Sequence, residues 1–365
     1  MRRSYITSIG RTWRKINEHN ETQKKHRVVK VIGMAVCVVV VLTAGLFFRL
    51  MTDTQIIVGA IQNLSQGIVN TKNLYEPLRD PVKATKDNGQ FIITEIRYAE
   101  EYPNSFLDIT YPDKNLETDR PTFIYFHGGG FFGGSKCDGD PLAEGDATAL
   151  LDDICAEGFN LVNIDYALVP EYHFPTPVLQ ANEAFRFLMD HAEEYHLDMD
   201  RVVIMGSSAG AIITSQLGSV LTNPEYAALL GINPALEPGQ VKALVIDDAP
   251  LDYEQFSLGT KLLVGNYVKG SIFLSKEEIK KYNNILSVTE DYITCVLLGG
   301  EYYADMRKLH DTLKEASVKH ILIDPLAERS IPVPHCFVSG ERTDGVAKDA
   351  FDRMMTFLKQ ETIQS

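Results

Sequence analysis

The sequence predicts an α/β fold in which helices flank a mainly parallel, doubly wound sheet, and two observations support this. First, eight short runs rich in β-branched and aromatic residues follow residue 90. These runs are residues 91–97, 106–111, 122–126, 160–165, 201–205, 241–246, 293–298 and 320–323. Second, helical patterns such as 142–155, 178–190 and 344–358 separate most runs from the third onward. We therefore expect the ligand site beyond the carboxyl ends of the strands.

The length of the chain favours one large domain. Of the 365 residues, about 315 follow the first fifty, which suits one α/β domain over 91–365 with a small cap. Two stretches could form that cap. Residues 51–90 begin with apolar side chains at helical spacing, and residues 253–286 show no strand alternation. The alternatives are a membrane-proximal spacer for the first and a surface helix for the second.

An uncharged apolar run fills residues 31–48 near the N-terminus. As a helix these 18 residues would rise about 27 Å, enough to span the hydrocarbon core of a membrane. Residues 1–30 hold nine lysines and arginines against two glutamates, so the positive-inside rule predicts a basic cytoplasmic segment there. We expect a transmembrane signal-anchor helix over 31–50 and an extracellular location for the large domain. A cleaved signal peptide is the alternative, but no clear A-x-A site follows the run.

The charge of the chain excludes some partners. The net charge is −14, and because residues 1–30 carry +7, the remainder carries −21. So acidic a domain should bind neither nucleic acid nor anionic surfaces well. The oligomeric state has no signature in the sequence.

The five cysteines give no metal-binding pattern. Cys37 lies in the apolar run, which leaves Cys137, Cys155, Cys295 and Cys336 for an extracellular domain to pair. Cys295 falls in an expected core strand and is better explained as an apolar filler. Because no metal-ligand spacing appears, we expect neither a metal nor an organic cofactor.

A nucleophile motif lies at residues 206–210, whose sequence GSSAG fits G-x-S-x-G. It follows the expected strand 201–205 and precedes a helix-like stretch, which is the strand-turn-helix context that this motif needs. A sharp turn of this kind tolerates only small neighbours, and glycines stand two residues either side of Ser208. We predict Ser208 as the nucleophile.

A second glycine motif begins at His127, where HGGG follows the expected strand 122–126. Backbone N–H groups aimed at a developing oxyanion lower the barrier to acyl transfer by about 3 kcal/mol per donor. We assign the donors of this oxyanion hole to Gly128, Gly129 and Ala209. A phosphate-binding loop is the alternative, but neither a Lys-Ser/Thr pair nor a G-x-G-x-x-G spacing accompanies the motif.

His335 is the best candidate for the general base. It follows the last expected strand, and a neutral imidazole can take the serine proton and return it to a leaving alcohol. The alternative is a loop histidine without a partner. His127 already serves the oxyanion loop, and the remaining histidines lie in ordinary helix, loop or strand positions or before the apolar run.

Together these residues resemble the hormone-sensitive-lipase-like branch of the α/β-hydrolase superfamily. Residues 163–175, NIDYALVPEYHFP, are similar to the family signature D-Y-R-L-A-P-E-x-x-F-P, and the loop of His335 resembles its H-G-F segment. The resemblance runs from about residue 91 to the C-terminus. Ser207 and Ala211 stand where the family usually has Asp and Gly, but both are small. The resemblance implies an eight-stranded α/β-hydrolase fold with a small helical cap.

The carboxylate of the expected triad departs from the family pattern. Relatives place an Asp in a D-x-L turn after strand seven, whereas the turn after 293–298 here reads GGEYYAD. Glu301 is the nearest carboxylate and is our first choice, since Glu performs this task in some hydrolases of this fold. Asp305 is second, although its position suits the start of a helix over 306–316.

Two further carboxylates complete the alternatives. Asp247 or Asp248, after the strand 241–246, is third, because some members of the superfamily take their acid from strand six. Asp324 copies the letters D-P-L but follows the wrong strand, so a turn after the last strand explains it better.

Three functions remain. The order Ser208, Glu301, His335 matches the nucleophile, acid, base order of α/β-hydrolases and favours a membrane-anchored extracytoplasmic carboxylesterase. The family resemblance implies small-molecule esters of short or medium acyl chains, including acetyl. The alternatives are a peptidase or amidase on the same fold, and a catalytically silent binding domain, which the missing Asp turn suggests.

Overall fold

The computed structural model describes residues 30, 32–34, 36–65, 70–73, 76–77, 79–137, 140–143 and 148–363. The chain divides into two compact units, Met1–Asp53 and Thr54–Ser365. The expected basic segment over 1–30 lies outside the described residues except for residue 30.

The first unit contains an apolar helix. Ile32–Thr52 is 21 residues long with a mean hydropathy of 2.3, so by length and composition it is able to cross a membrane. Most of its large apolar side chains are exposed, among them Val41 and Leu42, whereas Met51 near its end is buried. A signal sequence near an N-terminus has the same properties, so the helix fits either an anchor or a signal.

The second unit is built on a nine-stranded sheet with the order β1-β2-β3-β5-β4-β6-β7-β8-β9. The strands are β1 Lys83–Thr85, β2 Phe91–Arg97, β3 Phe106–Tyr111, β4 Pro121–Phe126, β5 Asn160–Ile164, β6 Asp198–Ser207, β7 Val241–Asp247, β8 Cys295–Leu298 and β9 His320–Ile323. The pairs β1–β2, β2–β3 and β3–β5 are antiparallel, and all later pairs are parallel. All eight expected strands are present. The expectation missed β1, because its three residues include no buried one and so give no pattern.

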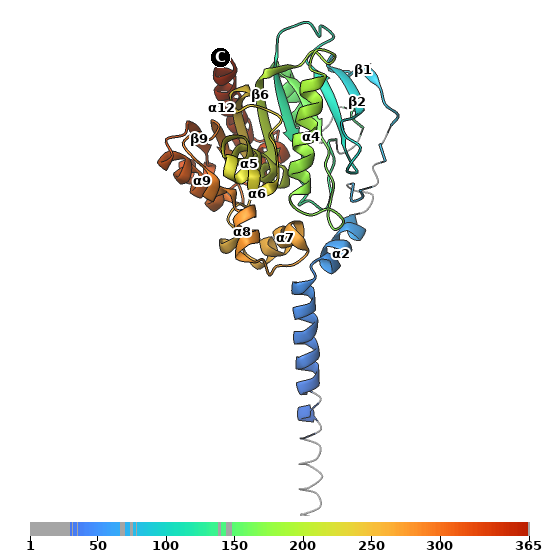
Figure 1. Cartoon of the computed structure of the whole chain (residues 1–365), viewed down its shortest axis with the longest axis vertical. Coiled ribbons are helices and arrows are strands. Elements are labelled where there is room, and N and C mark those ends of the chain that lie inside the picture. The colour runs from blue at the N-terminus through green and yellow to red at the C-terminus, as the bar shows by residue number, and fades with distance from the viewer. Residues whose placement is uncertain are drawn as a thin grey trace, which may run out of the picture. The chain divides into compact units, whose positions relative to one another are not determined.

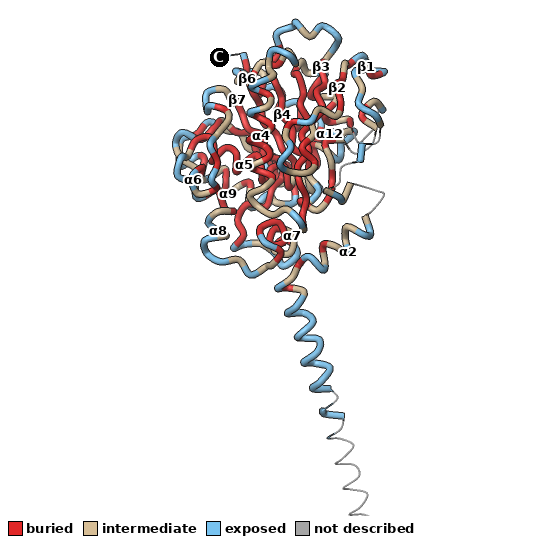
Figure 2. Tube along the Cα trace, turned by 45° about the vertical axis from the view of Figure 1, so that its right-hand side comes forward, coloured by how far each residue is buried: buried red, intermediate tan, exposed pale blue. Residues whose placement is uncertain are grey.

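Helices cover both faces of this sheet (Figure 1). Along β4, Phe123 and Tyr125 belong to one hydrophobic cluster, and Ile124 and Phe126 belong to the other. The first cluster includes residues of α3 Ala149–Ala156, α11 Phe337–Gly340 and α12 Gly345–Ile363. The second includes residues of α4 Thr176–Asp190, α5 Ala209–Thr222, α6 Pro224–Leu230 and α9 Tyr303–Glu315. The central strands therefore pack against helices on both sides, and Figure 2 shows that their residues are buried. This burial produces the continuous apolar runs by which the sequence predicts them.

A helical region lies outside the layers of the sheet. It comprises η2 Tyr253–Gln255, α7 Leu258–Lys269, α8 Lys276–Tyr282 and η3 Asn284–Ser287, within the expected cap over 253–286 or one residue beyond it. The segment 51–90 contributes α2 Gln55–Ser65, which lies against α7. There the Thr54 N–H donates to the Gly270 carbonyl at 2.9 Å and the Thr54 hydroxyl donates to Asn266 Oδ1 at 3.0 Å. Two short elements, η1 Pro238–Gln240 and α10 Pro325–Arg329, complete the unit.

Candidate active site

The G-x-S-x-G segment forms a sharp turn between β6 and α5. Ser208 has φ +55° and ψ −114°, in the left-handed region that L-residues rarely adopt. A Cβ added to Gly206 would come closer than 3.0 Å to the Gly210 carbonyl, and one added to Gly210 would come as close to the Phe126 carbonyl. Real Cβ atoms do not approach so closely, so both positions require glycine. The turn presents Ser208 at the carboxyl end of β6.

The Ser208 hydroxyl lies at one end of a short hydrogen-bonded relay. Its Oγ is 2.8 Å from Nε2 of His335, and Nδ1 of the same ring is 2.6 Å from Oδ2 of Asp248. Since Asp248 is fully buried as a carboxylate acceptor, we assign the ring proton to Nδ1, which leaves Nε2 free to accept the serine proton. The geometry brings together two of the expected residues, Ser208 and His335.

The carboxylate at His335 differs from our first choice. Glu301 Oε2 lies 3.9 Å from Nδ1, and its side chain is 61% exposed, whereas Asp248 is bonded directly. The expected contact between Glu301 and His335 is therefore wrong as a hydrogen bond, and Asp248, our third choice, makes it instead. Asp305 does not approach His335 as its acid either. Asp305 lies in the first turn of α9, the position that the sequence suggested. Its Oδ1 accepts hydrogen bonds from the N–H groups of Leu251 and Asp252.

Backbone donors hold the Asp248 carboxylate. The N–H groups of Gly300, Glu301 and Tyr302 donate to it at 3.0, 2.9 and 2.7 Å, and the Cys336 N–H donates at 3.1 Å. Burial alone would raise the pKa of Asp248, but the bonds from His335 and from these N–H groups outweigh it and lower the pKa below its ordinary value. Asp248 therefore stays ionised at neutral pH.

Two neighbouring groups have shifted pKa values as well. Burial lowers the pKa of His335, but the bond and charge of Asp248 act more strongly together, so the pKa lies above the ordinary value. Asp247, the other acid weighed with Asp248, faces Ser207 instead, whose hydroxyl donates to it at 2.7 Å. Burial raises the pKa of Asp247 to about 7. Ser207 thus has a polar role where the family pattern has Asp.

The glycine loop after β4 passes directly beside the nucleophile. A Cβ on Gly128 would lie 3.2 Å from the Ser207 carbonyl oxygen and 3.4 Å from Ser208 Cβ, so a side chain here would crowd the nucleophile turn. Among the described residues, the N–H groups of Gly128, Gly129 and Ala209 show no hydrogen-bond acceptor. They are therefore available to an oxygen next to Ser208, as the expected oxyanion hole requires.

His127 stabilises this loop through contacts with Gly128 and Tyr166. Its ring stacks on Tyr166 with centroids 4.2 Å apart, and its Nδ1 lies 2.7 Å from the Gly128 carbonyl. The Tyr166 hydroxyl donates to the His127 carbonyl at 2.7 Å. Burial lowers the pKa of His127 to about 4, so the ring is neutral. His127 is a structural part of the motif.

Sequence reasoning missed a buried ionic cluster beneath the loop. The Lys136 ammonium lies 2.8 Å from Glu95 and 3.2 Å from Asp108, and the Lys136 N–H donates to Asp165. Burial raises the pKa of Asp165 to about 8 and that of Asp108 to about 6. The only sequence signal was Asp165 in the D-Y-x-L motif, because Lys136 and Glu95 belong to no motif that we identified.

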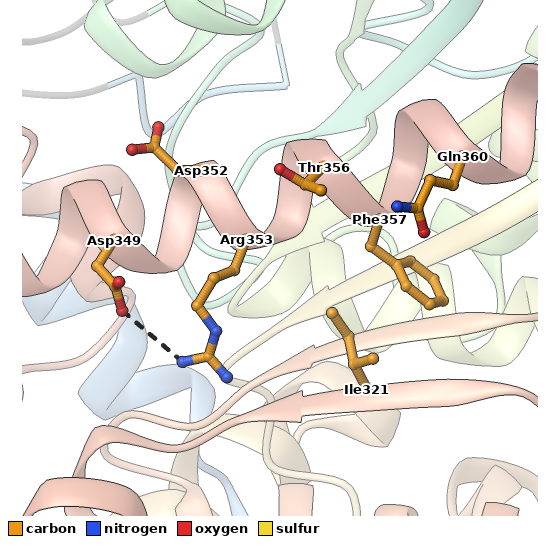
Figure 3. Close-up of a pocket in the computed structure, with 7 residues that line it drawn as sticks. All are labelled: Ile321, Asp349, Asp352, Arg353, Thr356, Phe357 and Gln360. Atoms are coloured by element: carbon orange, nitrogen blue, oxygen red, sulfur yellow. Dashed lines mark ion pairs between the residues drawn. The ribbon is translucent and has the colours of Figure 1, made fainter.

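A cavity of about 650 Å³ opens onto Ser208 and His335. Its other lining residues include Phe132, Leu150, Leu151 and Leu263, so the wall is partly apolar. A second hollow of about 350 Å³ lies between α12 and β9 (Figure 3). Arg353 there pairs with Glu328 at 2.7 Å, and the residues drawn include no nucleophile beside a base. The first cavity is therefore the candidate active site.

The structure also shows where the cysteines lie and which side chains are close enough together to bind a metal. All five cysteines lie within the described residues, and they form no disulfide with one another. Cys295 is buried in β8, as a filler should be. In the described part of the chain, one group of side chains could hold a metal: Asp248, His335 and Cys336, with ligand atoms within 4.8 Å of one another. Because two of these form the relay, a metal there would compete with it.

Comparison with known proteins identifies the family of the chain. Residues 107–291, half of the chain, match the family model BD-FAE. The chain belongs to the BD-FAE family. Esterase LipI of Mycobacterium tuberculosis is 32% identical to this BD-FAE member over 29% of the chain and 30% of its own length. Human arylacetamide deacetylase-like 2 is also 32% identical, over 35% of the chain and 31% of its own length. The matches thus span less than a third of these relatives.

The fold of this BD-FAE member is shared with solved esterase structures. Esterase B from Lactobacillus Rhamnosis (HN001) superimposes with a TM-score of 0.62 at 17% identity, covering 78% of this chain and 89% of that one. At this identity the likeness concerns the fold, and it supports the α/β-hydrolase fold. The predicted resemblance to the hormone-sensitive-lipase-like esterases is confirmed by the family match and the curated relatives.

Proposed function

We propose that this protein is a serine carboxylic ester hydrolase that works through an acyl-enzyme. The observation that carries the proposal is the relay from Ser208 Oγ to His335 Nε2 at 2.8 Å and from Nδ1 to Asp248 at 2.6 Å. The relay faces a partly apolar cavity, beside N–H groups that have no acceptor in the described residues. Nucleophile, base, orienting carboxylate and oxyanion donors are the parts that acyl transfer needs.

In the first half of the reaction, Ser208 Oγ attacks the ester carbonyl carbon while His335 Nε2 takes the hydroxyl proton. The carbonyl oxygen becomes negatively charged, and the N–H groups of Gly128, Gly129 and Ala209 stabilise it by donating hydrogen bonds. Asp248 stabilises the imidazolium. The C–O bond to the alcohol then breaks, and His335 returns the proton to the departing oxygen.

In the second half, water replaces the alcohol. His335 Nε2 accepts a proton from the water, whose oxygen attacks the acyl carbon. The same N–H groups donate hydrogen bonds to the second oxyanion. The bond to Ser208 Oγ breaks and the proton passes back to Ser208. The products are one carboxylic acid and one alcohol, and the enzyme is restored.

Short or medium acyl esters, including acetyl esters, are the proposed substrates. The cavity of about 650 Å³ suits a small molecule, and Phe132, Leu150 and Leu263 offer an apolar wall to an acyl chain. The name of the human relative refers to an arylacetamide, so an anilide should be tested beside the ester. We expect the ester to be the better substrate, and faster turnover of the anilide or of a peptide would favour the amidase alternative.

We also propose that the apolar helix anchors the enzyme, with the N-terminus in the cytoplasm and the catalytic unit outside. The 21-residue length of Ile32–Thr52 and the net charge of +7 over residues 1–30 support this orientation. Protease added to intact cells should digest the catalytic unit. Resistance of the catalytic unit to protease on intact cells would contradict the topology. If the N-terminal residue of the purified protein lay beyond residue 50, the apolar helix would be a cleaved signal.

Replacement of Ser208 tests the chemistry. We expect Ser208→Ala to lower kcat on a short-chain p-nitrophenyl ester by roughly 10⁴-fold or more. A reactive phosphonate should label the wild type at Ser208, located by peptide mass, and should not label the variant. Failure of the wild type to be labelled would favour the catalytically silent alternative.

A further inference from the structure

The oxyanion loop, residues 127–134, is held by the chain segment that precedes the sheet. The Gln62 side chain, on α2, places its amide close to three carbonyls, and the one within its own segment, that of Thr71, is the most distant at 3.5 Å. Its Nε2 donates to the Phe132 carbonyl at 3.0 Å and to the Val169 carbonyl at 2.8 Å. Val169 itself donates its N–H to the Phe131 carbonyl at 2.9 Å. Gln62 therefore links the oxyanion loop to the loop that follows β5.

The same segment contacts the loop at a second point. The Gly134 N–H donates to the Asn70 carbonyl at 2.8 Å. Three residues further on, the Asn73 amide exchanges two hydrogen bonds of 2.6 Å with the backbone of Leu168, next to Val169. Bonds from this segment therefore reach both ends of the turn that follows the HGGG motif.

The contact at Phe132 is coupled to the oxyanion donors through a single turn. The N–H groups of Phe132 and Gly133 both donate to the Gly129 carbonyl, at 3.2 and 3.1 Å. Gly129 has φ +102°, and a Cβ there would come closer than 3.0 Å to the Gly133 carbonyl, so the turn is tightly closed. The Gly133 N–H shares a peptide group with the Phe132 carbonyl and bonds the Gly129 carbonyl, so a displacement of the Phe132 carbonyl should shift Gly129. The Gly129 N–H, on the preceding peptide group, is one of the proposed donors.

The segment has its own fixed support. Thr54 is bonded to the backbone of Gly270 and to the side chain of Asn266 on α7, as described above. A Cβ added to Gly270 would lie 3.0 Å from the Gln55 amide, so α2 packs closely at this end. In sequence, Thr54 follows the apolar helix Ile32–Thr52 by two residues.

We propose that residues 54–65 and 70–73 are a positioning element for the oxyanion hole and that Gln62 is its principal positioning residue. The proposal rests on the proposed function, because it assumes that Gly128 and Gly129 stabilise an oxyanion. It assigns a role in the reaction to the stretch that directly follows the proposed anchor. Gln62 does not touch the substrate; it acts by fixing the peptide that does.

The test compares three variants of the full chain. Gln62→Met keeps the length of the side chain and removes the donors, and Gln62→Glu keeps its shape. Asn63→Ala is the matched control, because Asn63 is the exposed neighbour on α2. For each variant we would measure kcat and KM on a short-chain ester, Ki for a trifluoromethyl ketone whose adduct carries an oxyanion, and Tm.

We expect kcat to fall roughly tenfold in Gln62→Met and Gln62→Glu, because a misplaced donor costs up to about 100-fold. The affinity for the ketone should fall by the same factor, while KM changes less than about twofold. Asn63→Ala should behave as the wild type. Unchanged kcat and Ki in both Gln62 variants would overturn the proposal, and so would an equal loss in Asn63→Ala or a lower Tm without a change in Ki.

Ser208→Ala, assayed in parallel, separates the two proposals. If Ser208→Ala keeps its activity, the proposed function fails. If Ser208→Ala is inactive while Gln62→Met and Gln62→Glu bind the ketone as the wild type does, only the positioning role of Gln62 fails.

Discussion

Two neighbouring turns at the carboxyl edge of the sheet divide one task between them. Asp247 of β7 pairs with Leu298 of β8, so the turns that follow these strands lie side by side. The turn after β7 supplies the carboxylate of Asp248, which has φ +55° and is fully buried. The turn after β8 supplies the N–H groups that hold it. The side chain of Glu301, the carboxylate in this second turn, is 61% exposed.

The difference between the turns shows what qualifies a carboxylate to orient a histidine. A buried carboxylate loses its hydration and must be compensated by hydrogen bonds, and Asp248 receives four from backbone N–H groups in addition to His335. Glu301 keeps its hydration, so water screens its attraction to the ring. Proximity in sequence to the usual position of the acid is therefore a weaker guide than the supply of backbone donors.

Replacing Asp248 should have the largest effect on this comparison. Asp248→Asn keeps the shape of the side chain but offers His335 Nδ1 no charge and can favour the wrong ring tautomer. We expect kcat on a short-chain ester to fall roughly 10³–10⁴-fold with a small change in KM. A decrease in kcat of less than about tenfold would show that another carboxylate is the catalytic acid of the triad.

A methyl group in the turn after β8 should have an intermediate effect. A Cβ on Gly300 would lie 2.6 Å from Asp248 Oδ2 and 2.8 Å from the Pro334 carbonyl, so Gly300→Ala must displace the carboxylate or the loop of His335. We expect kcat to fall by about 10- to 100-fold. Gly299→Ala is the matched control, since its Cβ would make only an ordinary 3.5 Å contact with Asp324. Similar losses in the two variants would rule out a specific effect on Asp248.

Sequence alone revealed the parts of this molecule that depend on local geometry. The turn at Ser208 requires glycines within five residues, and the central strands are continuous apolar runs because helices cover both faces. No local pattern favours Asp248 over Glu301, because the role of Asp248 depends on N–H groups more than fifty residues later and on His335, 87 residues away. The contact of Gln62 with Phe132 spans 70 residues and has no motif. Long-range backbone contacts of this kind leave no local pattern.

The pH dependence of the reaction should report the pairing of His335 with Asp248. Burial lowers the pKa of His335, but the hydrogen bond and the charge of Asp248 have the larger effect, so the pKa lies above its ordinary value of 6.5. Since the neutral ring is the base, kcat/KM should rise with pH through a midpoint above 6.5. In Asp248→Asn, the loss of the charge lowers the pKa of the ring, so the midpoint of the residual activity should move to lower pH. A midpoint that stays in place would show that Asp248 does not set the pKa.

The smallest change is expected for Glu301, our first choice from the sequence. Its Oε2 lies 3.9 Å from Nδ1 of His335 across exposed surface, so it contributes a screened attraction to the imidazolium and no hydrogen bond. Glu301→Gln should lower kcat less than about threefold and move the acid midpoint slightly to lower pH, because a negative charge near the ring is lost. The Glu301 N–H, which bonds Asp248, is unaffected by this substitution, so the variant isolates the side chain from the backbone. Steady-state kinetics between pH 5 and 9, with Asp248→Asn in parallel, provide the measurement. A loss as large as that of Asp248→Asn would mean that both turns, and not only the one after β7, supply a catalytic carboxylate.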